Sequence, residues 1–130
     1  MDDSTVRKDG QVVNFEVDRF ADVIHRSKLA IGMAGTAHEQ AAGLGRVVVT
    51  CRGTGPQSSA KRMREQERLL GGAAIFVEGS PGSVASEVMR LLDDSEQLGR
   101  RGDEGRRRMG PAGASARIAG MLAASWREGL

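Results

Sequence analysis

The sequence predicts a single α/β domain with a three-layer architecture, in which about four parallel strands carry helices on both faces. Short apolar runs alternate with segments of helical spacing, a pattern that implies right-handed βαβ units. The run Val47-Val48-Val49 is apolar at consecutive positions, as in a parallel strand that is buried on both faces. Glycines fall between the apolar runs, where turns and helix caps are needed.

The first half of the chain alternates strands and helices. The apolar run at 12–15 predicts a short strand, and the spacing of Phe20, Val23 and Ile24 predicts a helix after it. A second strand is expected at 29–32, a helix at 36–44 and a third strand at 47–51. We expect all of these strands in one parallel sheet.

The second half is mainly helical. A polar loop at 52–57 leads into a helix that Gly71 and Gly72 end, and a fourth strand follows at 73–77. Ser80 and Pro81 are typical of the N-cap and the first position of a helix. Two further helices, at 94–108 and 112–126, are expected to pack along one side of the domain, with Trp126 packing the last one.

Composition excludes several classes of function. The net charge of +2 is too small for a nucleic-acid-binding surface, and the arginine-rich stretch at 100–108 is interrupted by Asp103 and Glu104, as in a solvated helix face. The only cysteine, Cys51, excludes an internal disulfide, and no metal-ligand spacing or cofactor motif is present. Without a signal peptide or a membrane-spanning apolar run, the chain is expected to be soluble and cytoplasmic.

The most informative motif is Gly-Met-Ala-Gly-Thr-Ala-His-Glu-Gln at residues 32–40, between two apolar runs. A turn of small residues that leads from a strand into a helix brings backbone N–H groups and the helix N-terminus against an anionic ligand. The expected ligand is a nucleotide.

Several segments together resemble a known family. They are residues 32–45, Gly55-Pro56-Gln57, Gln-Glu-Arg-Leu-Leu-Gly at 66–71 and Arg-Met-Gly-Pro-Ala-Gly at 108–113. The chain resembles the C-terminal part of lipid-A-disaccharide-synthase-related proteins and, more distantly, the peptidoglycan N-acetylglucosaminyltransferase and UDP-N-acetylglucosamine 2-epimerases. The resemblance implies a Rossmann-like half domain of a GT-B glycosyltransferase, which binds UDP or a UDP-sugar.

The resemblance also implies roles for individual residues. Glu39 would bind the ribose hydroxyls, and Gly35 and Thr36 would lie against the diphosphate. The backbone at Phe15 and Glu16 would approach the uracil edge. The implied substrate-binding residues are Phe15, Glu16, Gly35, Thr36, Ala37, Glu39, Gln40 and Gln57, and Gln57 would face the sugar.

Some of these residues also have a local explanation. Thr36 and Glu39 have the spacing of a capping box, in which both side chains satisfy N–H groups at the start of a helix. His38 would then point away from the cap, as a surface or packed residue. Gln57 could simply open its helix.

The chain resembles only the last third of such an enzyme, so we expect a donor-binding part without catalytic residues. The acceptor domain would come from an N-terminal partner chain, which could also hold the protein at the inner membrane. The alternatives are a noncatalytic nucleotide-binding or protein-interaction domain, and an epimerase relative, which the loop at 52–57 disfavours. An uncovered sheet edge and the face of Ile118, Met121, Leu122 and Trp126 predict a homo-oligomer, most simply a homodimer.

Overall fold

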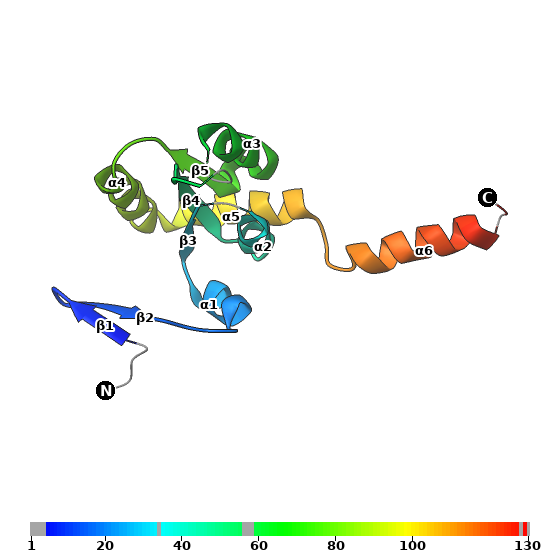
Figure 1. The fold of residues 1–130 in the computed structure, drawn as a ribbon, viewed down its shortest axis with the longest axis horizontal. Coiled ribbons are helices and arrows are strands. Elements are labelled where there is room, and N and C mark those ends of the chain that lie inside the picture. Colours follow the sequence, from blue (N-terminus) through cyan, green and yellow to red (C-terminus); the bar gives the residue numbers. More distant parts are fainter. Residues whose placement is uncertain (1–4, 34, 56–58, 128, 130) are drawn as a thin grey trace.

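A computed structural model describes residues 5–33, 35–55, 59–127 and 129. Its centre is a parallel sheet of β3 (Leu29–Gly32), β4 (Val47–Cys51) and β5 (Ala74–Val77), in the order β3-β4-β5 (Figure 1). In the register of the sheet, Leu29 lies beside Val47 and Val49 beside Ile75. The predicted α/β class is confirmed, with three strands in this sheet.

Helices cover both faces of the central strand β4, which is buried from Val47 to Thr50. On one face, α2 (Thr36–Gly43) contributes Ala41 against Val48, and α3 (Ala60–Leu70) contributes Met63 beside Thr50. On the other face, Leu91 of α4 (Pro81–Leu92) packs against Val47 and Val49. The arrangement therefore has the three predicted layers.

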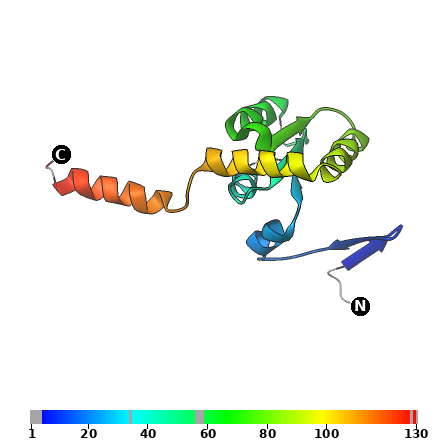
Figure 2. The same cartoon turned by 180° about the vertical axis from the view of Figure 1, so that it is seen from behind.

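Helix α5 (Ser95–Met109) connects these layers, because it contacts α2, α3 and α4 (Figure 2). The approach is close because Gly102 and Gly105 have no side chains: a Cβ at Gly102 would collide with the Gly45 carbonyl oxygen. The short 3-10 helix η2 (Gly71–Ala73) also lies against α5. Small residues on α5 thus set the spacing of the helices.

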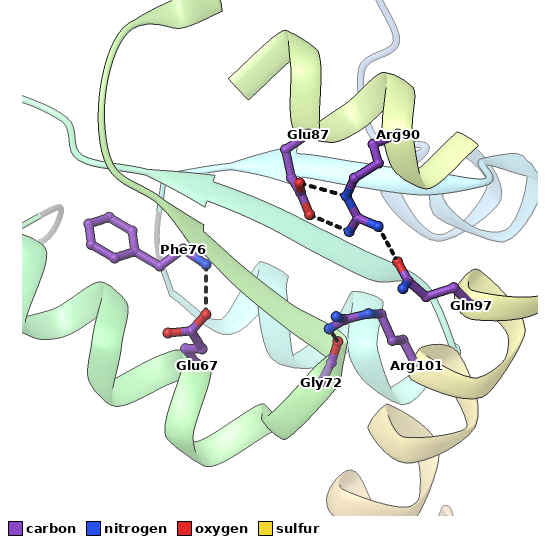
Figure 3. A network of polar contacts seen from close by, with 7 residues as sticks. All are labelled: Glu67, Gly72, Phe76, Glu87, Arg90, Gln97 and Arg101. Carbon is purple, nitrogen blue, oxygen red and sulfur yellow. Dashed lines mark hydrogen bonds and ion pairs between the residues drawn. The ribbon is translucent and has the colours of Figure 1, made fainter. Parts of the chain in front are cut away.

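Polar contacts hold α5 and the outer strand in place (Figure 3). Arg90 donates to both carboxylate oxygens of Glu87 and to Gln97, which joins α4 to α5. The hydrogen bond from Arg90 lowers the pKa of Glu87 below its ordinary value. Arg101 donates to the Gly72 carbonyl over 2.8 Å, so the arginine-rich stretch is not only the solvated face that its charges predict.

The strand expected at 12–15 does not join the parallel sheet. It forms β2 (Gln11–Asn14), which pairs antiparallel with β1 (Thr5–Lys8) and leads to α1 (Phe20–Arg26). The two turn residues, Asp9 and Gly10, both have positive φ, at 50° and 77°. An Asp-Gly turn of this kind favours a hairpin, so local pairing replaces the expected pairing with the central sheet.

The last helix, α6 (Ala114–Arg127), does not pack along one side of the domain as predicted. It extends away from the body in both views, and none of its described residues is buried (Figures 1 and 2). The expectation that Trp126 packs this helix against the domain is wrong, since Trp126 is 87% exposed. Among the described residues, no helix combines the length and apolar character that crossing a membrane requires.

Candidate functional site

A pocket of about 370 Å³ lies between the start of α2 and the exposed side of α3. Its lining residues are Gly35, Thr36, Glu39, Arg62, Met63, Glu65, Gln66 and Leu69, and we call it the α2–α3 pocket. Strand β3 ends at Gly32 and α2 begins at Thr36, so the pocket is at the carboxyl end of a parallel strand. Open α/β sheets bind their ligands at this end.

The glycine turn leaves backbone donors at the start of α2. Gly35 is the N-cap with φ 89° and ψ −166°, a backbone conformation that favours glycine, and no side chain caps the helix. The first N–H groups of a helix have no intrahelical acceptor, which here applies to Thr36 and Ala37. Together with the helix dipole, these N–H groups favour an anion at this end of α2.

The Glu39 carboxylate lines the pocket and makes no hydrogen bond or ion pair within the part of the chain that the structure describes. The capping-box explanation is therefore wrong. Thr36 is the first helical residue and not the cap, and neither it nor Glu39 satisfies an N–H group at the helix start. Glu39 is half-buried, and its acceptor oxygens are available to a ligand hydroxyl.

The pocket contains both signs of charge. Arg62 and Glu65 line it from α3, opposite Thr36 and Glu39 of α2. A guanidinium binds phosphate oxygens by charge-assisted hydrogen bonds, whereas carboxylates accept from hydroxyl groups. The arrangement therefore suits a ligand that carries both phosphate and hydroxyl groups.

Gln66 connects the pocket wall to the glycine turn, a role that sequence reasoning missed. Its amide Nε2 donates to the Gly35 carbonyl over 3.4 Å, and its Oε1 lies 2.6 Å from Nδ1 of His38. Because Oε1 can only accept, His38 donates from Nδ1. Of the two expectations for His38, a surface residue or a packed one, the structure confirms the packed one: it is 3% exposed and positions Gln66.

The other nitrogen of His38 faces the end of β3. Nε2 is buried and has no partner among the described residues. A Cβ built on Gly32 would lie 2.5 Å from it, so only a glycine leaves room for the imidazole. The position of Gly32 in the motif thus reflects packing against His38. Because His38 and Gln66 are 28 residues apart, only their polar character in the sequence could have suggested the contact.

The remaining predicted residues are more dispersed. Gln40 lines a second hollow of about 730 Å³ with Thr36, Glu39 and the connection from α5 to α6. Ala37 is exposed beside the turn, and Phe15 and Glu16 are exposed on the connection between β2 and α1. Gln40, Ala37, Phe15 and Glu16 do not line the α2–α3 pocket. Gln57 lies outside the described residues.

The structure thus brings three sequence-predicted residues, Gly35, Thr36 and Glu39, into one pocket with Arg62 and Gln66. Such a site can bind an anionic group at the helix start and a hydroxyl at the carboxylate. Comparisons of the chain with models of protein families, with curated proteins and with solved structures find no match.

Proposed function

We propose that this chain binds UDP or a UDP-sugar in the α2–α3 pocket, as the donor-binding part of a glycosyltransferase that resembles lipid-A-disaccharide synthase. The observation that carries the proposal is the meeting of Gly35, Thr36 and Glu39 in one pocket at the carboxyl end of the sheet. A helix N-terminus and a carboxylate that has no partner among the described residues provide the two interactions that a nucleoside diphosphate needs.

In the proposed complex, the diphosphate lies against Gly35 and the N–H group of Thr36 at the start of α2, and Arg62 supplies a cation from α3. Glu39 accepts hydrogen bonds from the ribose hydroxyls. Since Thr36 and Glu39 also line the second hollow, the rest of the ligand can extend across α2 towards Gln40. Nothing in this arrangement requires a metal ion or a cofactor.

Sugar transfer would require an acceptor domain from an N-terminal partner chain. Transfer needs a base beside the acceptor hydroxyl, and both substrates held in one cleft. His38 is unsuited to this role, because it is buried and its Nε2 faces Gly32. We therefore expect no turnover from the chain alone, and an active complex in the cytoplasm, held at the inner membrane through the partner.

Calorimetry or ligand-detected NMR with UDP and UDP-N-acetylglucosamine tests the proposal. We expect weak binding, in the micromolar to millimolar range. Glu39→Gln should weaken it by about 1–3 kcal/mol, the range for a lost charge-assisted hydrogen bond. Thermal unfolding should be nearly unchanged, because the Glu39 side chain loses no partner in the part of the chain that the structure describes. Glu96→Gln, at an exposed carboxylate on α5, is the matched control.

Absence of binding at several millimolar UDP would refute the proposal. Equal affinity of the wild type and the Glu39→Gln variant would remove Glu39 from the site. A noncatalytic binding or interaction domain is the alternative that the exposed apolar side chains of α6 favour. That alternative predicts no transfer even when an acceptor-domain chain is added, whereas the proposed function predicts transfer in the mixture.

A further inference from the structure

Helix α6 carries an uncovered apolar face. Ile118, Met121, Leu122 and Trp126 lie three or four residues apart, which places them on one side of the helix. Each is between 58% and 87% exposed. The charged residues of α6 give its described length a charge of +2: Arg117, one turn before Met121, donates to the Pro111 and Ala112 carbonyls, and Arg127 lies outside the apolar face. We call this surface the α6 face.

A second uncovered surface lies at residues 15–23, between β2 and the first turns of α1. Its apolar side chains are Phe15, Val17, Phe20 and Val23, each between 43% and 79% exposed. Three carboxylates, Glu16, Asp18 and Asp22, outnumber the single guanidinium of Arg19. Arg19 forms exposed ion pairs with Glu16 and Asp22, and the segment keeps a net charge of −2. We call this surface the acidic segment.

The α6 face and the acidic segment complement each other in both apolar character and charge. Within one chain, however, α6 extends away from α1 in both views, so it does not cover the acidic segment (Figures 1 and 2). Contiguous apolar surface of this kind is unusual on a monomer. The complement of each surface is present on every copy of the chain.

We propose that two copies form a closed dimer in which the α6 face of each covers the acidic segment of the other. Such a reciprocal exchange satisfies both surfaces by one two-fold axis, and two-fold dimers are the commonest soluble oligomers. Opposite charges favour this pairing over contacts between two α6 helices, which would bring like charges together. This inference is independent of the proposed nucleotide site.

The available area is sufficient for a stable dimer. Eight large apolar side chains per chain take part, and the two-fold axis doubles that number. If each buries on the order of 100 Å² on average, the interface totals roughly 1,600 Å², within the range of about 1,200–2,000 Å² for specific interfaces. The acidic segment would gain most, because α1 has a single buried residue, Ile24, in the isolated chain.

Light scattering and the fluorescence of Trp126, the only tryptophan of the chain, test the dimer. At about 100 µM, where even a micromolar dimer is populated, we expect twice the chain mass of 13.8 kDa. On dilution, the emission of Trp126 should shift to the red as the indole returns to water. Glu96→Lys, which reverses the charge of an exposed carboxylate on α5 that belongs to neither surface, is the control.

Charge reversal separates this dimer from other pairings. The double variant Glu16→Lys, Asp22→Lys reverses the acidic segment to a charge of +2. The double variant Arg117→Glu, Arg127→Glu reverses α6 to −2. Each should dimerise at least about tenfold more weakly than wild type, since each brings like charges together. An equimolar mixture of the two variants should recover the dimer, because both of its interfaces then join opposite charges.

A monomer at this concentration would overturn the proposal. So would a dimer that survives both charge reversals, which would assign the contact to α6 pairing with itself. A monomer whose Trp126 emission shifts to the blue on anionic vesicles would assign the α6 face to a lipid surface instead. Failure of the mixture to recover the dimer would also refute the reciprocal exchange.

Discussion

Replacing Gly32 by alanine should destabilise the domain by disturbing His38. The new methyl group would lie 2.5 Å from Nε2 and 3.0 Å from Cδ2 of the imidazole. Because the ring is only 3% exposed, it cannot turn into solvent without displacing its neighbours. Overpacking of this kind costs about 1–3 kcal/mol, and loss of the Nδ1 bond to Gln66 adds about 1 kcal/mol. We expect a total loss of about 2–4 kcal/mol.

Urea denaturation followed by circular dichroism measures this loss. The matched control is Gly99→Ala, within α5, where a Cβ would have no atom within 4 Å. Removing an exposed glycine from a helix interior should stabilise the domain by up to about 1 kcal/mol. The two substitutions add the same methyl group, so opposite signs would isolate the contact with His38.

A double variant provides the stricter test. His38→Ala removes the ring, so the methyl of Gly32→Ala then has room. The double variant should lose less stability than the two single variants together. Agreement between the double variant and the summed single effects within about 0.5 kcal/mol would refute the coupling. So would a Gly32→Ala variant as stable as the wild type.

Three other changes test the packing of α5. Gly105→Ala should cost about 1–3 kcal/mol in urea denaturation, because its methyl would lie 2.7 Å from the Ala42 carbonyl oxygen, and backbone yields little. Asp94→Ala removes the side chain that accepts from the Gln97 N–H and should lower the thermal midpoint through a loss of about 1 kcal/mol. Glu87→Gln should lower stability slightly at pH 7. Since the folded pKa of Glu87 is lowered, its contribution is complete above the ordinary value of 4.5 and disappears as the pH falls through the folded value, so unfolding curves of the two proteins should converge in acid.

Features encoded by neighbouring residues were predictable from the sequence. The Ser80 side chain caps α4 by accepting from the Ser83 N–H, and Pro81 begins the helix, as their types indicate. Strand β4 has the predicted bounds, because its unbroken apolar run suits only a strand covered on both faces.

Two kinds of feature could not be predicted in this way: the choice of a strand between alternative pairing partners, and contacts between residues far apart in the sequence. The prediction that the strand at 12–15 joins the parallel sheet is wrong, because the Asp-Gly turn at residues 9 and 10 brings residues 5–8 beside it as a nearer partner. In the candidate site, the motif at residues 32–40 predicted Gly35, Thr36 and Glu39, which all line the α2–α3 pocket. The contact of His38 with Gln66 joins two helices and follows only from their packing.

The two edges of the central sheet differ in their capacity to accept another strand. On the β5 edge, the N–H of Phe76 already donates to Glu67, and Arg64 pairs with Glu78 beside it. Charged side chains of this kind prevent a further strand from pairing. The β3 edge has no strand beside it in the described residues. Growth of the sheet by edge pairing is therefore possible only at the β3 edge. Two chains can pair there, but both outer edges of the joined sheet are then β5 edges, which opposes an endless fibre.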